Sequence, residues 1–450
     1  MTQLGEAIAR YHKILESGVP KTPDWVPQLR EQMAQRGLVL NNRPVSPVLR
    51  PHFLSRRQYT NLAKTAESLI SAIDRVRSIV LSNPVLLNRM ELLPAEKMLA
   101  SVDPGYPWPT VTALLDTQVN NGTVHYTDSS ADLPYGVVYG EILADLFYDT
   151  APVKEFRKKY KLAKTGGSKA LIAAVLKAYK DFGGKKKPHI GILEFKPPFH
   201  TPESHEMELL AEAIRAAGYA AQTVSPDQLE YRDGVLRSGD FVIDLIFRGV
   251  TAHEFLLRFD LLHPLVRAYR ERKVCMVNSF RSELSRKKAL LSLLTDDEVT
   301  EKFPAAEKKA IADSIPWTRM VAVSKTKHKN RTIDLIEFIQ RHREALILKP
   351  NDNSGEQPTF DGRQTDEAGW ERALRTALRT PYVVQERVDP MPVQFPVEIY
   401  GQVEMRDLMV DVQPQSFLGK VQGCSCRITP ASGAFSSLTG VAPTFILEVK

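Results

Sequence analysis

Short apolar runs alternate with helical stretches in the middle of this chain, and this alternation restricts its fold more than any other feature. The runs are PHIGILEF from Pro188, AAQTVS from Ala220, FVIDLIFRGV from Phe241 and KVCMVNS from Lys273. A helix is expected at Phe255–Arg272, between the last two runs. Strands that alternate with helices form a parallel, doubly wound sheet. Such sheets bind ligands beyond the carboxyl ends of their strands, where we expect Arg248 and Asn278. We therefore predict a Rossmann-like domain at about 185–280.

The remaining sequence divides into three further segments. A chain of 450 residues exceeds one ordinary core, so two or three domains are expected. Residues 1–100 are predicted to be helical, because Ser55–Val80 repeats apolar residues at helical spacing. Two β-like runs, TVTALLD and GTVHYTD, open the segment 101–184. Residues 281–450 mix strands and helices, and one helix is expected at LSRKKALLSLL (Leu284–Leu294). The predicted fold class is α+β.

Composition excludes several classes of protein. The chain is 43% hydrophobic and 25% charged, as in globular proteins. Its net charge of +7 is spread along the sequence, and no nucleic-acid-binding motif accompanies it, so we expect no nucleic-acid partner. No stretch is long and apolar enough to cross a membrane. The cysteines are few, at 275, 424 and 426, and have no metal-site spacing, which is typical of a cytoplasmic protein.

Lysines at strand ends are the first candidates for a binding site. No P-loop, dinucleotide-binding, serine-hydrolase or zinc-protease motif occurs. In the stretch ILKPNDNSGEQPTFDGRQT, Lys349 ends a buried strand, where a lysine can neutralise a phosphate. Lys288 could share that task, and Gln385, Glu386 and Val388 form a Q-E-x-V hinge suited to adenine and ribose. A solvated lysine in an ordinary loop is the alternative.

Several motifs together resemble the circularly permuted ATP-grasp family, of which glutathionylspermidine synthetase is the best-known relative. They are NSFRSELSRKKALLSLL, SIPWTRMV, LILKPNDNSGEQPTFDGRQT, WERALRTAL and PYVVQERV, with VIDLIFRGV and RPHFLSRRQYTNL upstream. The resemblance extends from about Arg50 to the C-terminus. It implies a permuted ATP-grasp fold with a helical N-terminal segment (1–100), a metal-side part (101–184), a Rossmann-like pre-ATP-grasp domain (185–280) and lysine-bearing subdomains (281–450).

The resemblance also implies an activity. Such proteins are ATP-dependent carboxylate–amine ligases that act through an acyl phosphate, with Mg²⁺ bridging the phosphates. Lys288, Lys349, Gln385, Glu386 and Val388 then correspond to the residues that bind ATP. The partners would be a small-molecule carboxylate and an amine, with Arg427 and Arg248 as catalytic anchors for a carboxylate or phosphate. Pairing of Arg248 with an acid such as Asp244 is an equally weighted structural alternative.

The metal-binding motifs depart from the family pattern. The family's R-x-D strand corresponds to Leu114–Asp116, which lacks the arginine, and its E-x-N strand places His125 and Thr127 at the glutamate and asparagine. Asp116 is then a metal ligand, and Asp128 or Asp132 could supply another from a shifted loop. EQPTFDG replaces the family's glycine-rich loop. A second hypothesis is therefore a degenerate ATP-grasp protein that binds a nucleotide or a partner protein without catalysis.

Overall fold

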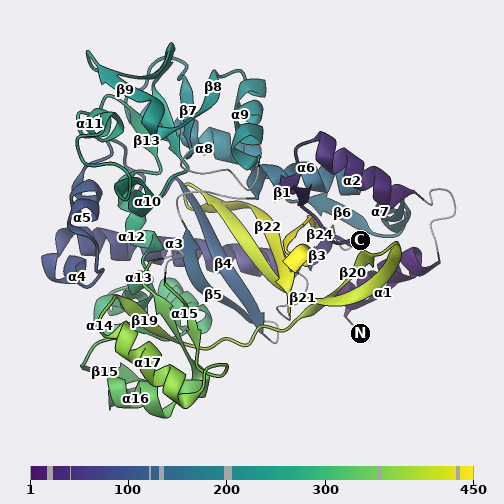
Figure 1. Cartoon of the computed structure of the whole chain (residues 1–450). Helices are drawn as coiled ribbons and strands as arrows, with labels where there is room; N and C mark the ends of the chain where they lie inside the picture. Colours follow the sequence, from purple (N-terminus) through teal and green to yellow (C-terminus); the bar gives the residue numbers. More distant parts are fainter. Residues whose placement is uncertain are drawn as a thin grey trace.

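The structure is a computed structural model that describes residues 2–17, 24–40, 42–120, 123–130, 136–196, 205–352, 357–431 and 436–448. Figure 1 shows a central sheet with a parallel-sheet unit above it and a smaller mixed unit, which carries Lys349, below it. A third group of helices and strands, together with both ends of the chain, lies to the right of the central sheet. In the described ranges no helix is long and apolar enough to span a bilayer.

The parallel sheet forms as predicted, with the strand order β13-β12-β7-β8 and all pairings parallel. Its strands are β7 (Ile190–Leu193), β8 (Ala221–Val224), β12 (Leu245–Arg248) and β13 (Cys275–Val277). Helices α8 (Ser168–Asp181) and α9 (Glu206–Ala216) cover one face, and α11 (Pro264–Arg270) covers the other. Antiparallel β9 (Leu229–Arg232), β10 (Val235–Ser238) and β11 (Phe241–Ile243) adjoin it, with the 3-10 turn η1 (Pro226–Gln228).

A helix expected from Phe255 to Arg272 is instead two helices, α10 (Ala252–Leu256) and α11. Pro264 stands at the first turn of α11, and the His263 side chain accepts a hydrogen bond from the Leu265 N–H. A residue before proline is disfavoured in helical geometry, so a single helix does not run through His263.

The central sheet joins strands from opposite parts of the sequence. Its order is β23-β22-β21-β4-β5, and β20 pairs with β21 at one edge. The strands are β4 (Thr112–Asn120), β5 (Thr123–Ser130), β20 (Val393–Ile399), β21 (Gln402–Phe417), β22 (Lys420–Pro430) and β23 (Gly440–Ala442). Leu114 of β4 lies opposite Gln415 of β21. The strand that carries Asp116 therefore lies beside a strand from the C-terminal part of the chain.

Strand alternation gives this sheet one apolar and one polar face. Leu115, Val410 and Val412 belong to the core that packs on α3 (Arg56–Ser82). The predicted helix Ser55–Val80 is thus confirmed, and it begins with a capping box between Ser55 and Gln58. The alternate residues of β4 and β21, which include Asp116, lie on the opposite face.

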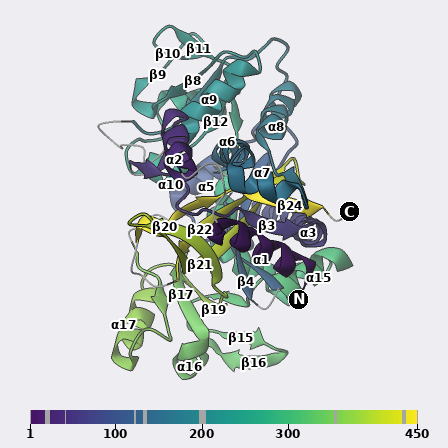
Figure 2. The same cartoon turned by 90° about the vertical axis from the view of Figure 1, so that its right-hand side faces the viewer.

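The unit with Lys349 contains an antiparallel sheet in the order β14-β19-β17-β18. Its strands are β14 (Thr318–Met320), β17 (Leu346–Pro350), β18 (Phe360–Asp361) and β19 (Tyr382–Glu386), and a hairpin of β15 (Lys325–His328) and β16 (Arg331–Asp334) adjoins it. Leu346 and Leu348 pack on α16 (Leu335–Arg341) and α17 (Glu367–Ala377). Lys349 therefore lies on the other face, and Figure 2 shows β17 and β19 beneath β21 and β4.

The helix expected at LSRKKALLSLL is also divided. It forms α12 (Glu283–Arg286) and α13 (Ala289–Leu294), because Lys287 has an extended backbone with ψ of 126°. Helices α14 (Asp297–Thr300) and α15 (Ala305–Ser314) follow. This part of the described chain also contains three 3-10 turns: η2 (Phe280–Ser282), η3 (Arg343–Ala345) and η4 (Ser436–Leu438).

The N-terminal hundred residues are mostly helical, as expected. They contain α1 (Gln3–Glu16), α2 (Trp25–Gln35), α3, α4 (Pro84–Asn88) and α5 (Pro94–Ser101), with short strands β1 (Val39–Leu40), β2 (Arg43–Pro44) and β3 (His52–Ser55). β24 (Thr444–Glu448) lies between β3 and β6 (Lys161–Lys164), near α6 (Val137–Tyr148) and α7 (Ala151–Arg157). The domain boundaries at about 100, 184 and 280 stay predictions.

Candidate functional site

Three carboxylates gather on the polar face of the central sheet. Asp116 of β4 lies directly opposite Asp128 of β5, and a register shift follows Asp116. The Gln413 Nε2 donates to Asp116 Oδ1 at 2.5 Å and to Asp411 Oδ2 at 3.2 Å. Burial, followed by the charge of Asp128, raises the pKa of Asp116. The Thr117 N–H donates to Asp411 at 2.7 Å, yet burial raises the pKa of Asp411 to about 8. Burial therefore disfavours the charged form of both Asp116 and Asp411.

Two lysines face these carboxylates from the unit below. Lys288 Nζ lies 3.2 Å from Asp128 Oδ2, and its side chain is only 4% exposed. Lys349 Nζ donates to Gln385 Oε1 at 2.8 Å. The pKa of Lys349 is lowered to about 8, chiefly by burial and also by Lys288, while Asp128 and Asp116 act in the opposite direction. Lys288 and Lys349 therefore lie near the same carboxylates of the polar face, which supply their counter-charges. A nucleotide-binding role for the two lysines stays a prediction.

Asn351 fixes the two lysine-bearing elements to each other. Its backbone carbonyl accepts the N–H of Lys288 at 3.0 Å, and its side-chain Oδ1 accepts the N–H of Ala289 at 2.8 Å. Its Nδ2 donates to the Met90 carbonyl at 2.9 Å. Asn351, two residues after Lys349, therefore joins the end of β17 to the start of α13, where Lys288 is the residue before the helix.

The hinge residues divide into two groups. Gln385 is buried, and besides accepting from Lys349 it donates from Nε2 to Thr318 Oγ1 at 3.0 Å. Glu386 lies at the surface side, 2.9 Å from His328 Nε2. Glu386 and Val388 line a cavity of about 730 Å³ together with Trp317. Glu386 and Val388 are thus on the rim of a cavity, whereas Gln385 contacts Lys349 below it.

The two predicted catalytic arginines have different surroundings. Arg427 of β22 is exposed and lies opposite Asp411, on the polar face. Arg248 is fully buried, and its guanidinium contacts Glu283 Oε1 at 2.7 Å, Ser282 Oγ at 2.7 Å and the Val250 carbonyl at 2.6 Å. These contacts favour a structural role for Arg248. Its acidic partner is Glu283, whereas Asp244 pairs with Lys186 at 3.0 Å.

The register of β5 changes the expected metal-side alignment. His125, expected where the family has glutamate, lies opposite Gln118 and lines the cavity beside the hinge. Thr127 is buried at the register shift, and Asp128 takes the place opposite Asp116. The extra residue in β5 is Thr127, so Asp128 and His125 both lie on the polar face, but only Asp128 is opposite Asp116. Asp132 lies outside the described residues.

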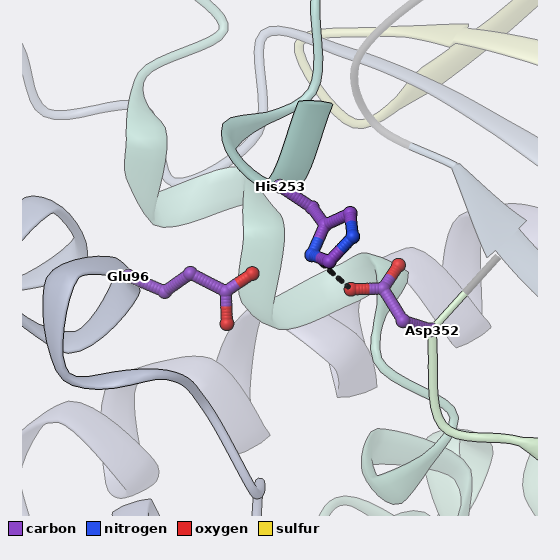
Figure 3. A group of neighbouring side chains, drawn as sticks. All are labelled: Glu96, His253 and Asp352. Atoms are coloured by element: carbon purple, nitrogen blue, oxygen red, sulfur yellow. Dashed lines mark ion pairs between the residues drawn. The ribbon is translucent and has the colours of Figure 1, made fainter. Parts of the chain in front are cut away.

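A second acidic cluster lies near the lysine pair. Glu96, His253 and Asp352 offer ligand atoms within 4.8 Å of one another, and Figure 3 shows their side chains converging. The Lys287 ammonium already bonds Glu96, at 2.9 Å, and Asp352. Burial lowers the pKa of Lys287, but the charges of Asp352 and Glu96 outweigh it and raise that pKa overall. A lysine therefore supplies the positive charge that a metal ion would bring.

Asp411, Gln413 and Asn351 were not among the predicted site residues. For Asp411 and Gln413 the available signal was the alternation of polar with apolar residues in LMVDVQP, which places both on the face of β21 opposite Val410 and Val412. For Asn351 the chain offers only its position two residues after Lys349, which does not reveal a bond to α13.

Comparison with known proteins supports the fold. No protein-family model matches the chain, and no curated protein matches its sequence. It is similar to the structure of a glutathione synthetase-like effector from Globodera pallida in the apo form, with a TM-score of 0.60, 12% identity, and coverage of 94% of this chain and 96% of that chain. A structure named "Putative gamma-glutamylcysteine synthetase" from Methylobacillus flagellatus gives a TM-score of 0.43, 10% identity and coverage of 88% and 87%. The chain thus has a mixed helix-and-sheet fold of the glutathione synthetase-like kind.

Proposed function

We propose that the chain is an ATP-dependent carboxylate–amine ligase with a circularly permuted ATP-grasp fold. One observation carries the proposal: Lys288 and Lys349, from two separate elements, converge on the paired carboxylates Asp116 and Asp128 of another sheet. A structural salt bridge alone needs one lysine and one acid. Two lysines and a carboxylate pair suit a polyphosphate with its metal ion. The likeness to the glutathione synthetase-like effector supports the fold that this arrangement needs.

In this proposal ATP lies between the two sheets. Lys288 and Lys349 bind its phosphates, and burial of Lys349 strengthens its attraction for them because water screens it less. Glu386 is placed to accept hydrogen bonds from the ribose, and the backbone at Val388 to contact adenine. The cavity of about 730 Å³ beside these two residues has room for a purine. Gln385 orients Lys349 through its 2.8 Å hydrogen bond.

The donor set of the polar face fits Mg²⁺. Asp116 and Asp128 offer carboxylate oxygens, which Mg²⁺ prefers, and no imidazole intervenes because His125 lies further along β5. Burial and the charge of Asp128 raise the pKa of Asp116, while Gln413, Arg427 and Lys288 act in the opposite direction. When bound, Mg²⁺ would neutralise charge on the phosphates. Lys288 would then exchange part of its contact with Asp128 for phosphate.

The reaction would join a small-molecule carboxylate to an amine. The carboxylate attacks the terminal phosphate of ATP, and ADP leaves as the acyl phosphate forms. The amine then attacks the acyl carbon, and inorganic phosphate and a proton leave as the amide forms. Arg427 is exposed on the polar face, beside the proposed phosphate site, so it is suited to hold the carboxylate substrate. Arg248 acts at a distance by supporting the loop after β13 through the carbonyl of Asn278.

Calorimetric titration with ATP, with and without Mg²⁺, tests the proposal, together with phosphate release in the presence of mixed carboxylates and amines. We expect Mg²⁺ to strengthen ATP binding, and Asp116→Ala to lower kcat far more than ATP affinity, because the metal acts chiefly on charge in the transition state. Asp149→Asn, an exposed carboxylate change, is the control. Folded protein that binds ATP equally well without Mg²⁺ and releases no phosphate would instead be a nucleotide-binding protein without turnover.

A further inference from the structure

A second cavity, of about 470 Å³, lies against the apolar face of the central sheet, opposite the side with Asp116 and Asp128. Part of its apolar wall is formed by Leu4, Ile8, Leu62, Val119, Val124 and Val412. Protein interiors are close-packed, so a space of this size exceeds an ordinary packing defect. Its volume is within the range of roughly 300–1,000 Å³ found for small-molecule pockets.

One buried cation lines this cavity. Arg50 is only 1% exposed. Its two terminal nitrogens donate to the carbonyls of Pro51 and Gln394, both at 3.0 Å, and the guanidinium lies 4.2 Å from the ring centre of Phe395. Its Nε has no hydrogen-bond partner, and no carboxylate of the described chain forms an ion pair with it. A buried guanidinium without an acidic partner is costly.

The titratable groups around Arg50 do not supply the missing charge. Burial, followed by the charge of Arg50, lowers the pKa of His12 to about 4 and that of His52 to about 3. Burial raises the pKa of Tyr11 and of Cys426, although Arg50 acts in the opposite direction. All four groups are therefore neutral near pH 7. The carboxylate of Asp313, which also lines the cavity, pairs with Lys309 at 2.7 Å, and no ion pair joins it to Arg50 in the described chain.

A second polar side chain lines the same cavity without partners. His52 stacks on Phe395, with ring centres 6.4 Å apart, and neither of its buried ring nitrogens has a hydrogen-bond partner in the described chain. A neutral imidazole always carries one N–H, so this donor is unsatisfied. An uncompensated cation and an unpaired donor thus lie in the wall of one largely apolar cavity.

We propose that this cavity binds a small molecule with one carboxylate and an unbranched apolar tail, at a site separate from the proposed nucleotide site. The carboxylate would meet Arg50 and His52, and the tail would cover the apolar wall. A guanidinium matches a carboxylate in geometry. A phosphate monoester would bring about two negative charges, one more than Arg50 balances.

Binding of decanoate, kept below its micellar concentration, tests this proposal by calorimetry. We expect one site per chain, at least tenfold weaker binding of decanol, and no binding of decylamine. Equal binding of decanoate and decanol would refute the role of Arg50, and absence of decanoate binding to folded protein would refute the site.

Two further variants locate the site. Val412→Phe fills the cavity and should weaken decanoate binding at least tenfold, while ATP affinity stays as in the wild type because Val412 faces away from Asp116. Val403→Phe is the control, because Val403 lies on the same strand and is 55% exposed. If Val412→Phe does not fold, as judged by its melting curve, Val119→Phe replaces it. Unchanged decanoate binding by the folded filling variant would place the molecule elsewhere and overturn the assignment.

Discussion

The backbone carbonyl of Asn351 accepts the N–H of Lys288 at 3.0 Å, although the two residues are 63 positions apart in the chain. This bond and the side-chain bond from Ala289 to Asn351 hold the end of β17 against the start of α13. Lys349 and Lys288 belong to these two elements. The distance between the lysines is therefore set by one buried asparagine, which itself touches neither ammonium group.

Replacement of Asn351 with alanine should weaken both stability and nucleotide binding. The change leaves the Ala289 N–H and the Met90 carbonyl without partners, which costs about 1–3 kcal/mol for each buried group. ATP affinity should fall at least tenfold, because Lys288 and Lys349 lose their mutual placement. Urea unfolding and calorimetry measure the two effects. Asn88→Ala, at an exposed asparagine, is the control. A destabilised variant with wild-type ATP affinity would show that Asn351 does not position the lysines.

ATP binding should depend on pH through Lys349. Its pKa of about 8 means that the free protein loses this charge above pH 8, so ATP affinity should fall between pH 7 and 9. Lys349→Arg should keep its affinity through pH 9, because a guanidinium stays protonated. Lys420→Met, at an exposed lysine paired with Glu67, should leave the profile unchanged. A wild-type affinity that is constant from pH 7 to 9 would contradict this assignment.

The same lysine has an effect on the stability of the ligand-free protein. Its folded pKa is depressed, so between about pH 8 and 10.5 the unfolded chain holds a proton that the folded chain has lost. The contribution of Lys349 to the free energy of unfolding should therefore rise with pH in this window. Urea unfolding of wild type and Lys349→Arg at pH 8 and 9.5 measures this contribution, because arginine does not titrate there. The wild type should gain stability relative to Lys349→Arg between these two pH values.

The sequence was sufficient to predict the elements whose patterns are local. The parallel sheet, α3 and the strand that ends at Lys349 follow from periodicity and were confirmed. The two divided helices were predicted wrongly because each break depends on something that periodicity does not record. In one case it is His263 before Pro264, and in the other it is the extended backbone of Lys287, whose ammonium bonds Glu96 and Asp352.

The site was predictable in part. Lysine at a strand end marked Lys349, and the family resemblance pointed to Asp116 and Lys288. The partner of Asp116 was harder to assign, because the extra residue Thr127 in β5 places Asp128 opposite Asp116 and leaves His125 opposite Gln118. The role of Arg248 depends on Glu283, which follows it by 35 residues and meets it only in the folded chain.

Variants should distinguish the roles of the two arginines that were predicted as catalytic, Arg248 and Arg427. Arg248→Met leaves Glu283 buried without its partner, so we expect a loss of about 3–5 kcal/mol in the free energy of unfolding. The double variant with Glu283→Leu should recover part of this loss, because no lone charge remains. Arg427→Gln should change the free energy of unfolding by no more than about 0.5 kcal/mol, since Arg427 is exposed, and should lower phosphate release. A stable Arg248→Met variant with lost turnover would restore Arg248 to the catalytic group.

Glu206 should make the protein less stable as the pH rises from about 4.5 to 7. Its carboxyl accepts the N–H of Val138 at the start of α6 at 2.9 Å, but burial raises its pKa to about 7. The folded chain therefore holds a proton that the unfolded chain has lost in this window, and stability falls as that proton leaves. Glu206→Gln keeps an acceptor for Val138 without the charge, so it should be roughly 1–3 kcal/mol more stable than wild type at pH 8 and nearly equal at pH 5. Urea unfolding at both pH values measures the difference, with Glu208→Gln on the exposed side of α9 as the control. An equal difference at pH 5 and pH 8 would show that the charge of Glu206 is not its cause.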